Sequence, residues 1–250
     1  MKVLFVGDVH NHYYIFKDID RLDKEYNFDR IIFTGDYVDD WYTTNRESAE
    51  TLDELFELKS SNPSKYTMCI GNHELSYMGF PCSGHQYELE ETIIHRLRDN
   101  INLLDLYAEV ELEKDKIWIC SHSGITNDFA YNELDRYGDN CIGVLREMNK
   151  DIKSSLPILQ KCSYYRGGDS SYSSFLWADK REMYSIFENS ENLVIPYQIV
   201  GHSPVKTISS ANTKDNEVWF IDTHSTYRDG SEFGDKSYLM WDGTKFEILY

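Results

Sequence analysis

Five segments of this 250-residue chain share one form, a short apolar run joined to a turn that contains glycine and potential metal ligands. They are 3-VLFVGDVH-10, 31-IIFTGDYVDD-40, 68-MCIGNHE-74, 117-IWICSHSG-124 and 198-QIVGHSP-204. A short apolar run that ends at a glycine turn is typical of a buried strand in a parallel sheet. The repetition of this form predicts an α/β fold whose strand ends carry the chemistry.

The segments between these runs indicate how the strands are connected. Over the first 72 residues, strands at 2–6, 30–36 and 67–72 alternate with amphipathic helices at 13–26 and 46–60, which predicts a parallel sheet with crossover helices. Further helices are expected near 86–99 and 142–154, and further strands in 101–112, 116–124, 197–202, 217–223 and 237–243, with the last two forming a hairpin. Because we find no linker or internal repeat, residues 1–250 are interpreted as one domain.

In open α/β sheets, ligands bind in the crevice beyond the carboxyl ends of the strands. Glycine at each turn allows the backbone to bend sharply and to approach its neighbours closely. The five strand ends could therefore bring the following residues into one cleft: Asp8, His10, Asp36, Asp39, Asn72, His73, His122 and His202.

These residue types match a site for two divalent cations. Ions held roughly 3.5–4 Å apart need a shared carboxylate and a mixture of oxygen and nitrogen donors. Residues i and i+2 leave an extended strand on the same side, so Asp8 and His10 are expected to reach one ion together. Asp36 is the natural bridge. The second ion would be completed by Asn72, His122 and His202.

Composition excludes several other classes of protein. Five cysteines without a CxxC pair argue against a disulfide framework or a thiolate zinc site: Cys69, Cys82, Cys120, Cys141 and Cys162. A formal charge of −18 argues against binding to duplex nucleic acid. The N-terminal apolar run is too short for a signal peptide, and no stretch approaches the roughly 20 apolar residues of a membrane span. We therefore expect a soluble, cytoplasmic protein without a membrane partner.

The ordered motifs GDVH, GDYVD, GNHE, SHSG and GHSP resemble those of the calcineurin-like metallophosphoesterases. The resemblance is to the phosphoprotein phosphatase (serine/threonine phosphatase) branch, of the bacterial and phage type. It extends through 175-FLWAD-179 and 220-FIDT-223 and so covers nearly the whole chain. The resemblance implies two mixed β-sheets packed as a sandwich and flanked by helices.

The resemblance also implies a mechanism and a set of roles. Asp8 and His10 would bind the first metal, Asp36 would bridge, and a metal-bridging water would attack phosphorus in line. His73 would protonate the leaving group, with Asp39 orienting it through a hydrogen bond; histidine suits this role because it releases a proton near neutral pH. Mn²⁺ is the expected metal, although mixed oxygen and nitrogen sites also accept Fe, Zn, Co or Ni.

The sequence departs from the family pattern at the phosphate-binding position. Asp40 stands where the family carries an arginine, and a carboxylate there would repel a phosphate dianion. Arg181 is the first candidate to replace that cation, and Arg166 is another. Asn11 and His224 also stand where glycine is usual, and His224 and His12 are expected to face solvent.

Three functions follow from these motifs. The first is hydrolysis of phosphomonoesters, on phosphoserine or phosphothreonine in proteins or on a small phosphoester. The second is cleavage of a dinucleoside polyphosphate or another nucleotide. The third is a catalytically weak metal-binding module that recognises a partner protein.

Overall fold

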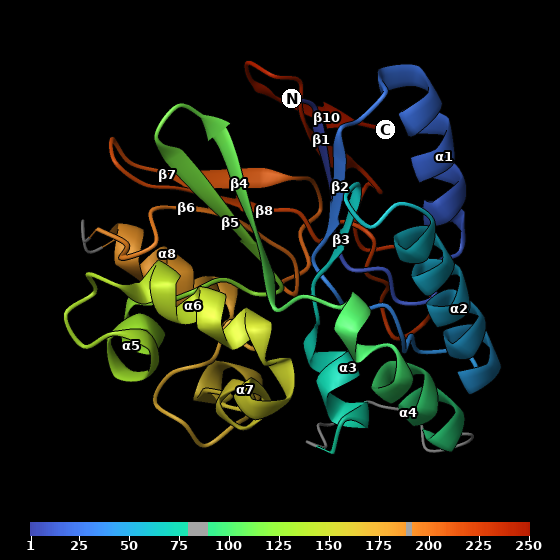
Figure 1. Cartoon of the computed structure of the whole chain (residues 1–250), viewed down its shortest axis with the longest axis horizontal. Helices are drawn as coiled ribbons and strands as arrows, with labels where there is room; N and C mark the ends of the chain where they lie inside the picture. Colours follow the sequence, from blue (N-terminus) through green and yellow to red (C-terminus); the bar gives the residue numbers. More distant parts are fainter. Residues whose placement is uncertain (80–89, 189–191) are drawn as a thin grey trace.

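The computed structural model describes residues 1–79, 90–188 and 192–250, and shows two mixed sheets packed against each other between helices (Figure 1). The first sheet has the order β10-β9-β1-β2-β3 and the second has the order β4-β5-β6-β8-β7. The first comprises β1 (Val3–Val6), β2 (Arg30–Phe33), β3 (Tyr66–Met68), β9 (Tyr238–Trp241) and β10 (Phe246–Leu249). The second comprises β4 (Tyr107–Glu113), β5 (Lys116–Ser121), β6 (Tyr197–Val200), β7 (Ser209–Asn212) and β8 (Glu217–Phe220).

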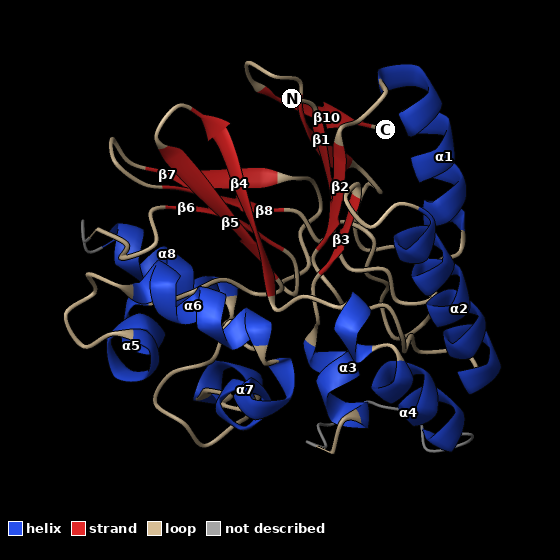
Figure 2. Cartoon of the chain, viewed as in Figure 1, coloured by secondary structure: helices blue, strands red, loops and turns tan. Residues whose placement is uncertain are grey.

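The helices cover the outer sides of the two sheets (Figure 2). They are α1 (Tyr14–Tyr26), α2 (Asn45–Ser61), α3 (Asn72–Tyr77), α4 (Glu90–Asp99), α5 (Asn127–Phe129), α6 (Cys141–Lys150), α7 (Ile152–Leu159) and α8 (Lys180–Glu188). Helix α2 begins at a capping box in which Thr44 and Glu47 exchange side-chain and backbone hydrogen bonds. None of the helices in the described ranges has the length and apolar character needed to cross a bilayer.

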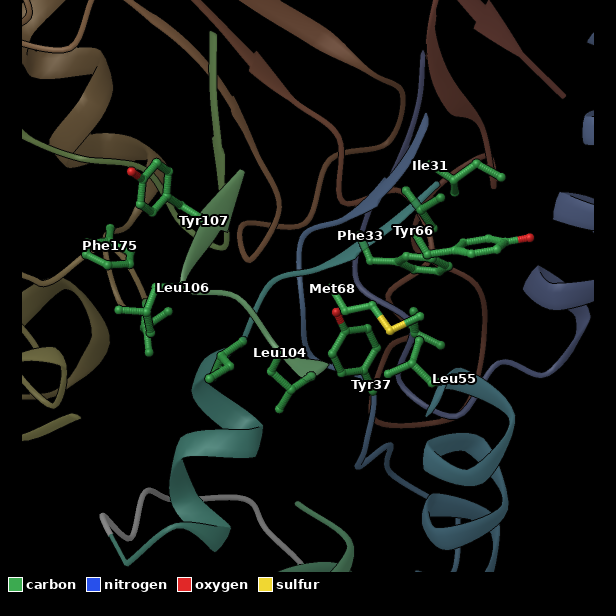
Figure 3. Close-up of a cluster of buried hydrophobic side chains, with 14 of the residues drawn as sticks. Ile31, Phe33, Tyr37, Leu55, Tyr66, Met68, Leu104, Leu106, Tyr107 and Phe175 are labelled. Atoms are coloured by element: carbon green, nitrogen blue, oxygen red, sulfur yellow. The ribbon is translucent and has the colours of Figure 1, made fainter. Parts of the chain in front are cut away.

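Alternation along β1 explains how the layers join. Val3 and Phe5 face the second sheet, where they share a buried cluster with Trp118 of β5. Leu4 and Val6 point the opposite way, into the large cluster beneath the helices. Figure 3 shows part of that larger cluster. Both faces of β1 are thus buried, as its uninterrupted apolar run predicts, and the sandwich is confirmed.

Three predicted elements differ from the structure, and the first is the strand expected in 101–112, which begins only at Tyr107 after a 3₁₀ helix at Ile101–Leu103. The expected hairpin of 217–223 with 237–243 is wrong, because β8 pairs with β6 and β7, whereas β9 pairs with β1 and β10. The missed turn is at Asp242, whose N–H donates to the carbonyl of Lys245 and starts β10. The helix expected at 142–154 divides at Asp151, whose side chain accepts from Ser154 N and caps α7. The start of the helix expected at 86–99, like Cys82, lies outside the described residues.

Candidate metal centre

The strand ends of both sheets meet at one edge of the sandwich. Asp8 follows β1, Asp36 follows β2 and Asn72 begins α3 directly after β3, while His122 and His202 follow β5 and β6. Strands β1, β2 and β3 are parallel to one another, and so are β5 and β6, so their carboxyl ends point the same way within each sheet. The side chains of all five are buried.

One group of possible metal ligands consists of Asp36, His122 and His202. Nε2 of His122 lies 3.3 Å from Oδ2 of Asp36 and 3.0 Å from Nδ1 of His202. The same Nε2 lies 2.8 Å from Oδ1 of Asn72. Three other predicted ligands therefore lie around one imidazole nitrogen of His122.

A second group consists of Asp36, His10 and His73. Nε2 of His10 lies 3.8 Å from Oδ2 of Asp36 and 3.8 Å from Oδ2 of Asp8. Nε2 of His73 lies 4.0 Å from the same oxygen of Asp36. Asp36 is thus common to both groups, as a bridging ligand would be, and His73 is close enough to belong to one of them.

The hydrogen bonds of Nδ1 in His122 and His10 show which ring nitrogen of each imidazole faces the ligand groups. Nδ1 of His122 lies 3.0 Å from the carbonyl oxygen of Thr34, and Nδ1 of His10 lies 2.6 Å from that of Asp39. Because a carbonyl oxygen only accepts hydrogen bonds, each Nδ1 carries a proton, and Nε2 is the ring nitrogen that faces the ligand groups and whose lone pair a bound cation would take up. Metal-binding histidines are held in this way. The donor set therefore fits divalent cations.

Charges in the centre reinforce this fit. Burial, and then the negative charge of Asp222, raises the pKa of the Asp8 carboxyl to about 8. Burial alone would lower the pKa of His10 and His122, but the carboxylates of Asp36 and Asp8 outweigh it and raise both to about 9. Clustered buried carboxylates that draw protons onto neighbouring imidazoles create the negative potential that a cation would neutralise.

The turns that present the ligands use left-handed backbone conformations. His10, Asp36, Asp39 and His202 have φ values of 43°, 50°, 65° and 61°. Few residues other than glycine adopt such values, and they concentrate where function requires strain.

The prediction that Asp8 and His10 leave an extended strand is wrong, because β1 ends at Val6 and His10 lies in this turn.

Two glycines are required because the chain passes directly beside a carboxylate. A Cβ atom on Gly71 would lie 2.1 Å from Oδ1 of Asp36, and one on Gly201 would lie 2.1 Å from Oδ1 of Asp8. The expected close approach of the backbone is thus present at both turns. In return, the N–H of His202 donates to Oδ1 of Asp8 at 2.9 Å, which fixes the orientation of that carboxylate.

His73 lies at the start of α3 and contacts Asp39. Its Nδ1 is 2.9 Å from Oδ2 of Asp39, whose other oxygen accepts from the hydroxyl of Tyr77 at 2.6 Å. Burial disfavours the charged ring, but Asp36 and the Asp39 hydrogen bond outweigh burial and raise the pKa of His73. Asn72 and His73 were expected to lie in an extended turn, where neighbouring side chains point in different directions. They are instead the first two residues of helix α3, and their side chains diverge for that reason.

A pocket of about 430 Å³ opens over these groups. It is lined by His10, Asp36, Asp39, Asp40, Trp41, Asn72, His73, Arg166, Trp177, His202, Pro204, Ser225 and Thr226. Arg166 reaches it while paired with Asp179 at 2.9 Å and bonded to Ser203 Oγ at 2.9 Å. Arg181 binds the same Asp179 at 2.7 Å but remains 59% exposed and is absent from the lining.

A model of the calcineurin-like phosphoesterase family matches residues 1–241. The chain belongs to this family. Members are phosphoric ester hydrolases, and the family implies divalent metal ions, which the two ligand groups sharing Asp36 could hold.

Two curated relatives match over 72 residues, which is 29% of this chain and only 22% of each relative. The serine/threonine-protein phosphatase 6 catalytic subunit of Drosophila melanogaster is 36% identical there, and a protein phosphatase 2A catalytic subunit of Dictyostelium discoideum is 39% identical. A cold-active protein-tyrosine phosphatase of a psychrophilic Shewanella species has a TM-score of 0.56 at 16% identity, over 100% of this chain and 80% of that chain. At this identity the likeness concerns the fold.

Two buried carboxylates in this phosphoesterase centre were not predicted from the sequence. Glu74, the last residue of GNHE, accepts hydrogen bonds from the N–H groups of Asp36, Tyr37 and Gly71 at 2.8–2.9 Å. It therefore ties the turn after β2 to the start of α3. Asp222 follows β8 in the same way that Asp8 follows β1, and this strand-end position is the signal that could have identified it.

His224 is buried, contrary to the expectation of a surface residue. Its Nδ1 is 3.1 Å from the hydroxyl of Tyr14, and its ring lies 4.8 Å from that of Tyr238. His12 is half-buried, and its Nε2 is 3.8 Å from Oδ2 of Asp40. This burial could not be predicted from the sequence, because Tyr14 lies 210 residues before His224 and reaches it only in the folded chain.

This burial predicts a pH-dependent stability. Burial, followed by the positive charges of His12 and Lys236, lowers the pKa of His224 to about 3 from 6.5, while Asp235 opposes the shift. Stability from the neutral ring is present above pH 6.5 and is lost as pH falls toward 3. Between pH 7.5 and 5.5 the unfolding free energy of the wild type should fall by about 1.4 kcal/mol more than that of His224→Gln.

Urea unfolding of the metal-free protein at the two pH values measures this difference. His95→Gln, which removes an exposed imidazole from α4, is the matched control and should follow the wild type. Equal pH dependence of wild type and His224→Gln would contradict the prediction.

Proposed function

We propose that residues 1–250 form one catalytic domain that hydrolyses phosphomonoesters with two divalent cations. The observation that carries the proposal is the pair of ligand groups that share Asp36 beneath an open pocket. Asp8 and His10 would hold one cation, Asn72, His122 and His202 the other, and Asp36 both. When bound, such cations supply a water nucleophile at neutral pH and neutralise charge on the phosphoryl group.

His73 is proposed as the general acid. Its Nδ1 is engaged by Asp39, so Nε2 is the atom that faces the pocket and can deliver a proton to the leaving oxygen. Asp39 acts through His73: it fixes the tautomer and the ring orientation, and Tyr77 in turn holds Asp39.

The proposed substrate class is a phosphoserine or phosphothreonine protein, and the local similarity to two serine/threonine phosphatase subunits supports it. A dinucleoside polyphosphate is the alternative, but it carries several phosphates, and Arg166 is the one Lys or Arg among the described pocket-lining residues. Mn²⁺ is the first metal to test.

Hydrolysis of p-nitrophenyl phosphate with Mn²⁺, Fe²⁺, Zn²⁺, Co²⁺ or Ni²⁺ tests the proposal. Activity should require a divalent cation and disappear with chelator. Absence of turnover with every metal would contradict the phosphoesterase proposal and favour the metal-binding interaction module. Comparing a phosphopeptide with diadenosine tetraphosphate separates the two substrate classes.

Replacing Arg166 and replacing Arg181 are expected to have different kinetic effects. Arg166→Ala should raise KM about tenfold with a smaller change in kcat, because a guanidinium that lines the pocket can bind the phosphate. Arg181→Ala should stay within about twofold of the wild type, because exposed ion pairs contribute little. Steady-state kinetics on one phosphopeptide measures both, and Arg166→Lys tests whether charge alone is sufficient. Equal effects of the two alanine variants would contradict the assignment of Arg166.

A further inference from the structure

An indole ring forms part of the pocket wall. Trp41 lines the pocket, yet 57% of it is exposed. A second indole, Trp177, also lines the pocket, but its ring packs edge-on at 6.1 Å from that of His202 and belongs to the wall of the metal centre. Trp41 is therefore the more exposed of the two indole rings that line the pocket.

The backbone of Trp41 is held in place. Oδ1 of Asp40 accepts from the N–H of Trp41 at 2.8 Å and from the hydroxyl of Thr226 at 2.7 Å. The indole Nε1 donates to the carbonyl of Thr226 at 3.3 Å. These bonds tie residues 40–41 to the opposing segment 225–226, and both segments line the pocket. An apolar ring that is fixed while still exposed binds a partner at little cost in conformational entropy.

The charges at this end of the pocket restrict what the partner can be. Asp39 and Asp40 both line it, and Arg166 is the one positive Lys or Arg side chain among its described lining residues. A second phosphate would lie beside these carboxylates, and no second Lys or Arg of the described lining would neutralise it. The guanidinium carbon of Arg228 lies 5.9 Å from the centre of the Trp41 ring, which is a cation–π distance. Arg228 itself does not line the pocket.

We infer that the substrate carries a planar aromatic group beside its single phosphate, and that Trp41 determines specificity by stacking against that group. The inference rests on the proposed phosphomonoesterase function and narrows its substrate class. The aromatic group could be the esterified ring itself, as in phosphotyrosine, or the side chain next to a phosphoserine. Asp40 is a positioning residue in this arrangement, since it acts through Trp41.

Binding of phosphonates tests the inference without turnover. Calorimetry on the Mn²⁺-loaded protein should show phenylphosphonate binding about three- to tenfold more tightly than methylphosphonate, the range expected for an aromatic pair. Trp41→Ala should abolish this preference and Trp41→Phe should retain it. Tyr42→Ala is the matched control, because Tyr42 is a neighbouring exposed aromatic residue outside the lining, and it should also retain the preference.

Persistence of the preference in Trp41→Ala, or an equal loss of affinity for both phosphonates, would overturn the inference. Hydrolysis of three peptides then identifies the source of the ring: one with phosphotyrosine, one with phosphoserine beside phenylalanine, and one with phosphoserine beside alanine. Trp41→Ala should slow hydrolysis of the phosphotyrosine peptide if the esterified ring stacks, or of the phosphoserine–phenylalanine peptide if the neighbouring side chain stacks. It should leave hydrolysis of the phosphoserine–alanine peptide unchanged. Absence of hydrolysis of every ester would contradict the proposed function, whereas hydrolysis of all three peptides at rates that Trp41→Ala leaves unchanged would overturn the inference alone.

Discussion

Asp36→Asn is expected to lower kcat at least about a thousandfold and to reduce the bound metal below two ions per chain. Oδ2 of Asp36 lies 3.3 Å from Nε2 of His122 and 3.8 Å from Nε2 of His10, so this one oxygen serves both ligand groups. Replacing a carboxylate by an amide removes the negative charge that the two proposed ions would share, while keeping the shape of the side chain. Asp36→Asn should therefore weaken metal binding by both ligand groups at once.

Steady-state kinetics and elemental analysis of the same preparation measure the two effects. Asp53→Asn, on the surface of α2, is the matched control and should keep wild-type activity and metal content. Thermal unfolding of the metal-free proteins checks folding, because the Asn side chain can still accept the hydrogen bond from the N–H of His73. A variant that retains two metals and activity within tenfold of the wild type would refute Asp36 as the bridge.

The ligand groups could be predicted because their signal is local. Each predicted ligand stands next to an apolar run that forms a strand. Because the carboxyl ends of parallel strands meet at one edge of a sheet, these ligands are expected to lie close together. Asp36, His122 and His202 converge although 86 and 80 residues separate successive members in the numbering. Such convergence follows from sheet topology alone and needs no knowledge of side-chain conformation.

The backbone conformation of those same residues could not be predicted. A left-handed φ at His10 or His202 is strained in isolation and persists only because surrounding contacts enforce it. Asn11, at φ 61°, is easier to read from the sequence, because asparagine tolerates this region better than most residues that carry a side chain. Its amide lies 2.7 Å from Thr43 Oγ1 and 2.9 Å from Ser48 Oγ.

The pocket wall was also beyond prediction, because it depends on pairs of distant loops. Asp40 reads in sequence as a lost phosphate-binding residue, but in the fold it bonds Thr226, 186 residues away. The choice between Arg166 and Arg181 likewise rests on contacts with Asp179 and Ser203 that no spacing reveals. Periodicity identifies strand ends, whereas specificity is built from segments that meet only after folding.

His73→Gln is expected to lower kcat/KM for a phosphoserine peptide by about 10²–10⁴-fold, the usual contribution of a general acid. The same variant should lose much less with p-nitrophenyl phosphate, because a nitrophenolate leaves without first being protonated. Asp39→Asn should show the same dependence on the leaving group with a smaller loss, since it removes the carboxylate that orients Nδ1 of His73 at 2.9 Å.

The dependence on the leaving group separates the two roles that the geometry allows His73. Its Nε2 is 4.0 Å from Oδ2 of Asp36, close enough for His73 to be a metal ligand with His10. A ligand lost from the metal centre would weaken metal binding and slow both substrates equally, because both need the same ions. If His73→Gln reduces the metal content and slows the peptide and p-nitrophenyl phosphate by the same factor, then His73 binds metal and another group must donate the proton.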